Sequence, residues 1–284
     1  MSKFTAAVVQ LSSGTDINAN IAAMESGIRQ AAAQGATYIQ TPEMTGLVQQ
    51  NRKEFFETVC NEADDPVAPA ASRLAKELGV TVHLGSTPIQ VAPQMAANRS
   101  YLFGPDGQQR ASYDKIHMFD VDLANGESWR ESAVYQPGKH GVTVDVEGAL
   151  LGMAICYDCR FPELHTAYAR LGVQILTGPS CFTRQTGRAH WHALLRSRAI
   201  ENGAYMIAAA QGGDLEDGRE TYGHSIIINP WGEVIGEVAG EEPGIALAEI
   251  DTLQVAKARE RIPNLVNNRA FSMINVGSNA ENVA

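Results

Sequence analysis

The feature that most constrains the fold of this chain is a regular alternation of strand-like and helix-like segments along nearly its whole length. In the opening third, Asp16 or Asn18 provides an N-cap for a helix, and Gly79 ends a second helix. The expected strands here span 6–11, 37–40 and 80–84, and the expected helices span 16–33 and 68–78. This order is typical of an α/β protein in which helices cover a sheet.

The same alternation continues to residue 261. Two stretches, Gly-Pro-Asp-Gly at 104–107 and Asn-Pro-Trp-Gly at 229–232, have the composition of tight hairpin turns. Further strands are expected at 101–103, 109–112, 142–146, 150–155, 174–177, 205–210, 225–228, 234–238 and 245–250, and further helices at 162–171, 187–202 and 252–261. A chain of 284 residues with this pattern predicts one α/β domain over 1–270. The tail, 271–284, has weak periodicity, and we expect it to wrap a neighbouring subunit or to be partly disordered.

Charge and composition narrow the class of partner. The formal net charge is -10 and no Lys/Arg-rich run stands out, which argues against a nucleic-acid partner. No apolar stretch approaches the ~20 residues needed to cross a bilayer, and the first residues lack the features of a secretory signal. Four cysteines are too few for a disulfide framework in a chain of this length. We therefore expect a cytoplasmic protein that acts on a small molecule.

Three expected strands end at or near an ionisable residue: Glu43 follows 37–40, Lys115 follows 109–112, and Cys156 follows 150–155. Ligand sites in α/β sheets gather at such strand ends. A thiol before a helix can also experience the positive helix N-terminus, which favours the thiolate. Brought together, these side chains would form a nucleophilic acyl-transfer site.

Each group has a role in that hypothesis. Glu43 would accept the proton of Cys156, and Lys115 together with the backbone N–H of Tyr157 would stabilise an oxyanion. Spacing alone leaves the alternative open, because a strand-end Glu or Lys is usually solvated and a Cys after an apolar strand is usually an inert buried thiol.

The motifs around these residues resemble those of the nitrilase superfamily of carbon-nitrogen hydrolases. Three segments, Thr-Pro-Glu at 41–43, Tyr-Asp-Lys-Ile-His at 113–117 and Cys-Tyr-Asp-Cys-Arg-Phe-Pro-Glu at 156–163, look like its Glu-Lys-Cys triad segments in family order. The resemblance continues through motifs at 178–180, 186–191, 196–202, 222–225 and 229–232. It implies a single-domain, four-layer α-β-β-α sandwich, a homodimer or higher homo-oligomer, and no metal or organic cofactor. It also implies a second glutamate near the nucleophile, for which Glu131 matches better than Glu127.

The resemblance further implies hydrolysis of an amide through a cysteine thioester. Within the superfamily, the motifs Thr-Gly-Arg-Ala-His-Trp and Tyr-Gly-His-Ser most resemble the branch of deaminated glutathione amidase, with omega-amidase as its near neighbour. Such substrates are 2-oxo acid amides that carry carboxylates and need a cationic anchor. Arg184 or Arg188, at the start of the 187–202 helix, is the candidate, and a surface arginine is an equally good interpretation of each. N-carbamoyl amino acids and nitriles remain alternative substrates.

Other readings of the same residues are weaker. Cys156 and Cys159 form a Cys-x-x-Cys pair, which would suit a redox protein, but Asp158 between them opposes thiolate formation. His190 and His192 are two residues apart on an expected helix, so they cannot share a zinc ion. His224 is expected to be a hydrogen-bonded histidine, and Arg160 to pair with carboxylates such as Glu163. A non-catalytic binding protein is disfavoured because the full triad is present.

Overall fold

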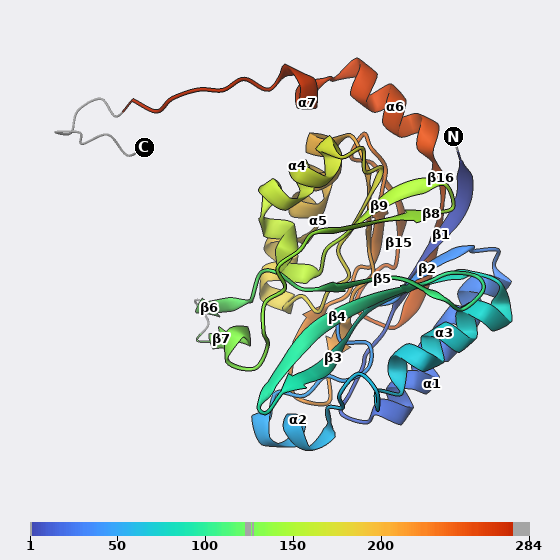
Figure 1. The fold of residues 1–284 in the computed structure, drawn as a ribbon, viewed down its shortest axis with the longest axis vertical. Helices are drawn as coiled ribbons and strands as arrows, with labels where there is room; N and C mark the ends of the chain where they lie inside the picture. Colours follow the sequence, from blue (N-terminus) through green and yellow to red (C-terminus); the bar gives the residue numbers. More distant parts are fainter. Residues whose placement is uncertain (1, 123–125, 127, 275–284) are drawn as a thin grey trace.

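Two six-stranded sheets face each other in the computed structural model, which describes residues 2–122, 126 and 128–274 (Figure 1). The first sheet has the order β16-β1-β2-β3-β4-β5 and the second the order β15-β14-β11-β10-β9-β8. The strands of the first are β1 Lys3–Gln10, β2 Tyr38–Gln40, β3 Thr81–Ala92, β4 Met95–Phe103, β5 Gln109–Asp114 and β16 Gly244–Asp251. Those of the second are β8 Val142–Val146, β9 Ala149–Met153, β10 Ile175–Thr177, β11 Tyr205–Ala208, β14 Ile226–Ile228 and β15 Val234–Glu237.

Helices α1 (Ile17–Ala33) and α3 (Val67–Leu78) cover the outer face of the first sheet (Figure 1). Helix α1 begins at Asp16, whose side chain accepts the backbone N–H groups of Asn18 and Ala19. Helix α3 ends at Gly79, which adopts the left-handed conformation. Glycine does so without steric cost because it has no Cβ. An apolar core fills the space between these helices and the strands.

The second sheet is covered in the same way by α4 (Pro162–Arg170) and α5 (Arg184–Asn202). A separate core lies between the two sheets and includes Val8 and Tyr38 from the first and Leu151 and Ile207 from the second. The layers are therefore helix, sheet, sheet and helix, and the expected single-domain α-β-β-α sandwich is confirmed.

Several elements differ from the sequence expectations. Strand β3 continues to Ala92 and pairs with β4 along its length. A register shift between Leu84 and Thr87 lets the strand pass Gly85, and Pro88 pairs with Asn98. Helix α2 (Arg52–Thr58) and two small hairpins were not expected. The hairpins are β6 (Asp120–Asp122) with β7 (Ser128–Arg130), and β12 (Gly212–Asp214) with β13 (Glu220–Tyr222). Both hairpins border the cavity described below.

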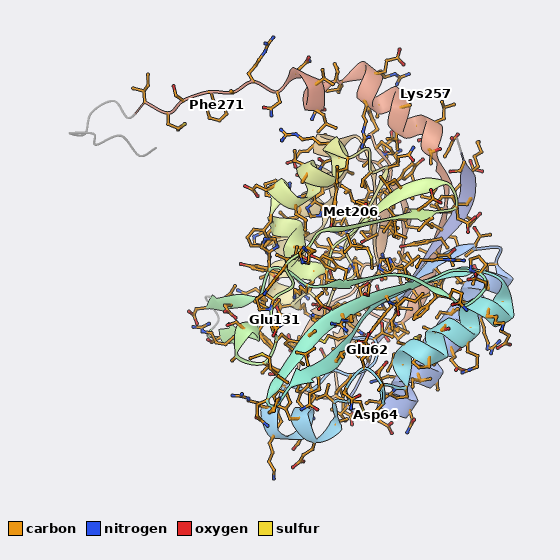
Figure 2. All side chains as sticks on the ribbon, viewed as in Figure 1. Glu62, Asp64, Glu131, Met206, Lys257 and Phe271 are labelled. Atoms are coloured by element: carbon orange, nitrogen blue, oxygen red, sulfur yellow. The ribbon has the colours of Figure 1, made fainter. Side chains whose placement is uncertain are left out.

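After β16 the chain continues through α6 (Thr252–Arg261) and α7 (Asn264–Asn267) and then leaves the body of the molecule (Figure 1). Phe271 projects from this extended segment, well away from the sheets (Figure 2), and is 84% exposed. The last ten residues of the expected 271–284 tail lie outside the described residues. Among the described residues, no helix combines the length and apolarity that a membrane span needs.

Candidate active site

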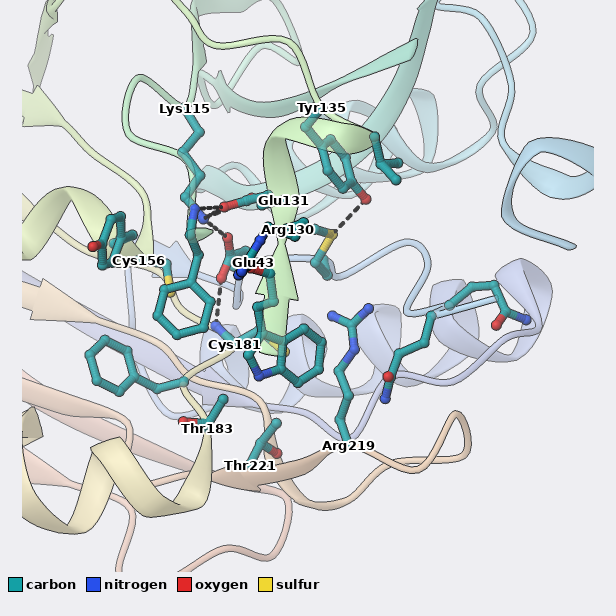
Figure 3. A pocket seen from close by; sticks show the side chains of 18 of the residues that line it. Glu43, Lys115, Arg130, Glu131, Tyr135, Cys156, Cys181, Thr183, Arg219 and Thr221 are labelled. Carbon is teal, nitrogen blue, oxygen red and sulfur yellow. Dashed lines mark hydrogen bonds and ion pairs between the residues drawn. The ribbon is translucent and has the colours of Figure 1, made fainter. Parts of the chain in front are cut away.

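Glu43, Lys115 and Cys156 converge on one cavity of about 280 Å³ (Figure 3). Glu43 follows β2 by three residues, Lys115 directly follows β5, and Cys156 opens η2 (Cys156–Arg160), three residues after β9. Two of these side chains come from the first sheet and one comes from the second. The strand-end placement expected from the sequence thus brings the three predicted groups together across the sandwich.

Cys156 occupies a strained corner. Its φ is +48°, in the left-handed region that non-glycine residues rarely adopt, and its N–H donates to the carbonyl of Pro179 at 2.9 Å. The next N–H, that of Tyr157, has no acceptor among the described residues, as is usual for the first turn of a helix. It is therefore free to donate to an oxygen of a bound molecule beside the Cys156 thiol.

The pKa of the Cys156 thiol is set mainly by burial and not by a helix N-terminus. Burial raises the pKa of this thiol well above its usual value, Glu43 raises it further, and Lys115 only partly opposes this. The element that follows is also a five-residue 3-10 turn rather than an α-helix, because α4 begins only at Pro162. As a nucleophile, Cys156 would therefore need a base to remove its proton.

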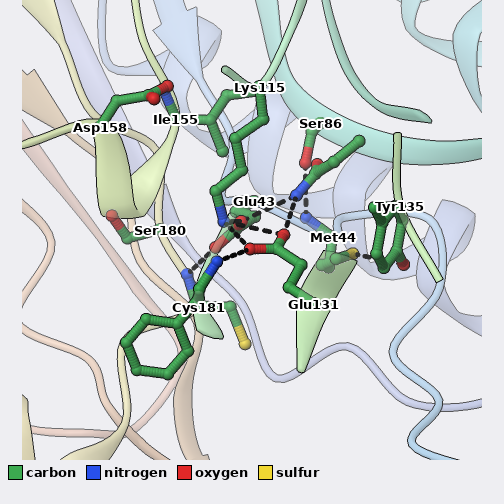
Figure 4. Close-up of polar contacts among 12 residues, drawn as sticks. Glu43, Met44, Ser86, Lys115, Glu131, Tyr135, Ile155, Asp158, Ser180 and Cys181 are labelled. Atoms are coloured by element: carbon green, nitrogen blue, oxygen red, sulfur yellow. Dashed lines mark hydrogen bonds and ion pairs between the residues drawn. The ribbon is translucent and has the colours of Figure 1, made fainter. Parts of the chain in front are cut away.

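Glu43, Lys115 and Glu131 form a buried ion cluster behind the thiol (Figure 4). The ammonium of Lys115 lies 2.9 Å from Oε1 of Glu43 and 2.9 and 2.8 Å from the two carboxylate oxygens of Glu131. Glu131 opens the short η1 turn (Glu131–Ala133) and also accepts the N–H of Phe119 at 2.6 Å. The chain thus places Glu131 beside the other three predicted groups.

The charges in this cluster depend on one another. Burial alone would lower the pKa of Lys115, but the carboxylates of Glu131 and Glu43 raise it well above its usual value. Burial raises the pKa of Glu131, while Lys115 opposes that rise. Lys115 is therefore a permanent cation, able to stabilise a developing negative charge in the cavity.

Two groups that orient Glu43 were missed by the sequence analysis. Asn98, fully buried on β4, donates from Nδ2 to Oε1 of Glu43 at 2.8 Å and to Glu131 at 3.3 Å. The backbone N–H of Cys181 donates to Oε2 of Glu43 at 2.7 Å. The only signal for Asn98 was an asparagine, a residue type depleted in strands, in a segment that also contains Arg99 and Ser100. Cys181 acts through its backbone, which no side-chain motif could have indicated.

A third missed group, Asp158, ties the nucleophile to the lysine segment. It is completely buried and accepts the N–H of Ile155 at 2.9 Å and the hydroxyl of Tyr113 at 2.7 Å. It also accepts both the backbone N–H and the ring Nδ1 of His117, at 3.0 and 2.6 Å. One carboxylate therefore contacts the residue before Cys156 and residues two positions on either side of Lys115.

The structure does not bring Arg184 or Arg188 to the cavity. Arg184 instead forms ion pairs with Asp214, Glu220 and Glu241, so its guanidinium is already occupied. Helix α5 begins at Arg184, earlier than the sequence suggests, and two of these partners, Asp214 and Glu220, lie on the β12–β13 hairpin. Tyr157, the other predicted substrate-binding residue, does line the cavity.

Arg160 does not take the expected carboxylate partner. Its guanidinium lies 3.4 Å from Nδ1 of His190 and packs over the rings of Tyr157 and Phe182. Within the described part of the chain, no ion pair joins it to Glu163. It fixes the corner after the nucleophile by ring contacts rather than by charge pairing.

The geometry gives little support to the redox and zinc-site interpretations of the sequence. Burial raises the pKa of Cys159 to about 12, which opposes a role as a reactive thiol. His192 bonds to Glu237 at 2.8 Å, away from His190. His224 stacks on Tyr222 with its Nδ1 2.6 Å from that residue's carbonyl. In the described ranges, no three His, Cys, Asp or Glu side chains are grouped to hold a metal ion.

Comparison with known proteins gives a consistent result. The family model described as carbon-nitrogen hydrolase matches residues 5–260. A deaminated glutathione amidase from Yersinia enterocolitica is 36% identical and covers 96% of each chain, and the human omega-amidase NIT2 is 36% identical over 93% of this chain and 94% of that protein. The NitFhit protein of C. elegans superimposes with a TM-score of 0.88 at 33% identity, covering 95% of this chain and 66% of that longer chain.

Proposed function

This chain belongs to the carbon-nitrogen hydrolase family, and from that premise we propose that it hydrolyses the side-chain amide bond of a 2-oxo acid amide through a Cys156 thioester. Deaminated glutathione is the proposed substrate. The observation that carries the proposal is the contact of Lys115 with both Glu43 and Glu131 beside the Cys156 thiol, in a cavity of about 280 Å³. Such a cavity admits a small molecule.

The acylation step follows from the positions of these groups. Glu43 takes the thiol proton as Sγ of Cys156 attacks the amide carbon, because the thiol is not ionised at rest. The carbonyl oxygen becomes an oxyanion, which Lys115 Nζ and the Tyr157 N–H stabilise. The carbon–nitrogen bond then breaks as Glu43 returns the proton to the leaving nitrogen. A free amine and a thioester on Cys156 result.

Deacylation uses the same carboxylate. Glu43 removes a proton from water, the resulting hydroxide attacks the thioester, and the carbon–sulfur bond breaks. The proton returns to the sulfur, so the carboxylic acid leaves and the thiol is regenerated. In this scheme Glu131 does not exchange a proton with the substrate. It holds Lys115 in place through two contacts, at 2.9 and 2.8 Å, and keeps that cation charged.

Omega-amidase activity on 2-oxoglutaramate is the second candidate, because relatives with both names are 36% identical to this chain over more than nine-tenths of its length. The two substrates share the 2-oxo acid acyl part and differ in the leaving group. Ammonia leaves from 2-oxoglutaramate, whereas cysteinylglycine leaves from deaminated glutathione. The chemistry at Cys156 is the same for both.

A matched substrate panel tests the proposal. Release of ammonia or amine would be measured from 2-oxoglutaramate, deaminated glutathione, an N-carbamoyl amino acid and a simple nitrile, with the Cys156→Ala variant as blank. We expect the highest kcat/KM with deaminated glutathione. A preference for 2-oxoglutaramate would reassign the enzyme as an omega-amidase, and Cys156-dependent turnover of the carbamoyl compound alone would overturn the amide assignment.

The proposal also covers assembly and location. We assign catalysis to residues 1–270 and self-association, as a homodimer or larger, to the tail 271–284. The exposed apolar side chains of Phe271, Met273 and Ile274, each 81–84% exposed, support this assignment. Sedimentation of the full chain and of a Phe271→Ser, Met273→Ser variant tests it, and a wild-type monomer at all concentrations would refute it. The free thiols suit the reducing cytoplasm.

A further inference from the structure

We propose that Arg219 binds a carboxylate on the leaving-group side of the scissile bond, and that the enzyme therefore selects amides whose departing amine ends in a carboxylate. This inference rests on the proposed function and narrows it. A peptide-like leaving group such as cysteinylglycine has this carboxylate, and ammonia does not.

Three arginines line the cavity, and they differ in how much of their charge is already used. Arg130 is half exposed and forms two hydrogen bonds to the carboxylate of Asp122, at 2.8 and 2.9 Å. Arg52 is exposed at the start of α2, with its guanidinium over the ring of Phe56. Arg219 is the least exposed of the three, with a side chain that is 18% accessible.

Arg219 is held in position by Asp217 and Trp129. Its Nε lies 3.0 Å from Asp217, and its guanidinium packs over the ring of Trp129 at 5.3 Å. Within the described part of the chain, no other carboxylate lies within ion-pair distance of it, since the neighbouring Glu220 pairs with Arg184 at 2.9 Å. Apart from Asp217, the guanidinium interacts with the uncharged Cys181 thiol and with no second carboxylate among the described residues, so a substrate carboxylate can form the charge-assisted contact there.

Cys181 shows on which side of the reaction Arg219 lies. The backbone N–H of Cys181 donates to Glu43. The Cys181 side chain interacts with the Arg219 guanidinium. Burial raises the pKa of the Cys181 thiol to about 12, and the charge of Arg219 opposes that rise. Figure 3 shows the same order, with Glu43 and Cys181 between Cys156 and Arg219. Glu43 protonates the leaving nitrogen, so the leaving group must extend from Cys156 past Glu43. Its far end then reaches Arg219.

The acyl part of the substrate has a different environment. Next to Cys156 the cavity is also lined by Tyr157 and Phe182, whose rings pack against the Arg160 guanidinium. In the proposed binding mode the 2-oxo acid group of either substrate lies beside Tyr157, and the leaving group extends to Arg219. Loss of Arg219 should therefore affect only substrates with a charged leaving group, which separates its role from that of the residues that carry out the chemistry.

The experiment pairs one enzyme change with one substrate change. We would measure kcat and KM of the wild type and the Arg219→Gln variant with deaminated glutathione, with the same compound carrying a glycine carboxamide in place of the glycine carboxylate, and with 2-oxoglutaramate. Arg219→Gln should lower kcat/KM for deaminated glutathione on the order of 10- to 100-fold, mainly through KM, because one charge-assisted contact is lost. For the carboxamide and for 2-oxoglutaramate, the same substitution should change kcat/KM by less than about twofold.

Two controls make the result specific. Arg52→Gln removes the same formal charge from the mouth of the cavity and should leave all three substrates unaffected, whereas Arg219→Lys should restore part of the loss. The inference would be overturned if Arg219→Gln lowered kcat/KM equally for the acid and the carboxamide. It would also be overturned if Arg52→Gln lowered kcat/KM for deaminated glutathione as much as Arg219→Gln does. If Arg219→Gln fails to fold, a wild type that does not prefer the acid over the carboxamide would also overturn it. Lack of wild-type turnover of every substrate would instead reject the proposed function.

Discussion

Replacement of Asp158 by asparagine should damage both stability and catalysis, although the two side chains have nearly the same shape. The carboxylate accepts four hydrogen bonds, two at each oxygen: Oδ1 serves the backbone and ring of His117, and Oδ2 serves Ile155 and Tyr113. The amide of the Asp158→Asn variant keeps one acceptor oxygen. The other two donors would then face an NH2 group.

The cost can be worked out donor by donor. A tyrosine hydroxyl can rotate, and a histidine can change tautomer, so that each accepts a hydrogen bond from the new amide. The backbone N–H groups of Ile155 and His117 cannot adjust in this way. Whichever orientation the amide takes, one of them is left buried and unpaired, at about 1–3 kcal/mol. Loss of charge assistance at the remaining contacts adds about 1 kcal/mol, so the total is roughly 2–4 kcal/mol.

Catalysis should fall as well, because Ile155 precedes Cys156 and the other contacts flank Lys115. A shift of about 1 Å between these groups can reduce turnover on the order of 100-fold. Urea unfolding and kcat with 2-oxoglutaramate would be measured for Asp158→Asn and for Tyr113→Phe as a control. The control removes one donor without stranding a backbone N–H and should cost only about 1 kcal/mol. A stability within about 0.5 kcal/mol of wild type for Asp158→Asn would refute the reasoning.

Three further predictions concern the catalytic cluster and the buried histidine network. Lys115→Ala should reduce kcat by at least about 100-fold while the chain stays folded by circular dichroism, and substantial residual turnover would remove Lys115 from oxyanion stabilisation. Gly85→Ala should disturb Glu43 indirectly, because a Cβ at this position would lie 2.0 Å from the carbonyl oxygen of Thr41. We expect a lower kcat and a lower melting temperature. Unchanged values of both would contradict the close contact. Burial lowers the pKa of His83 from 6.5 to about 3, so the unfolded chain binds a proton that the native state does not, and stability should fall as the pH decreases from about 6.5 towards 3. His83→Gln should reduce that slope by up to about 1.4 kcal/mol per pH unit in urea unfolding, and an unchanged slope would exclude His83 as its source.

The elements that the sequence predicts best are those whose signals are local. The N-cap at Asp16 and the stop at Gly79 are properties of a few neighbouring residues, and α1 and α3 follow them closely. The expected strand 80–84 is shorter than β3, which passes Gly85 by a register shift against β4 and keeps Pro88 paired with Asn98, although both residue types usually interrupt strands. Pairing with a distant strand therefore overrode the local preference.

The same distinction applies to the site. Glu43, Lys115 and Cys156 could be found because each follows an apolar strand in a recognisable motif. Asn98 contacts Glu43, and Asp158 contacts Tyr113 and His117, all distant in the chain, so these roles depend on the completed fold. The raised pKa of the Cys156 thiol also depends on the completed fold, since burial outweighs the influence of the short turn that follows it.

The division of the site between two sheets also has a consequence for the order of folding. Glu43 and Lys115 belong to the sheet that α1 and α3 cover, and Cys156 belongs to the sheet that α4 and α5 cover. Each sheet can form its own hydrogen bonds before the two dock, but a reactive thiol meets its base only afterwards. A folding intermediate with one finished sheet would have full strand pairing there and no hydrolytic activity. The first appearance of turnover during refolding therefore marks the docking of the two halves.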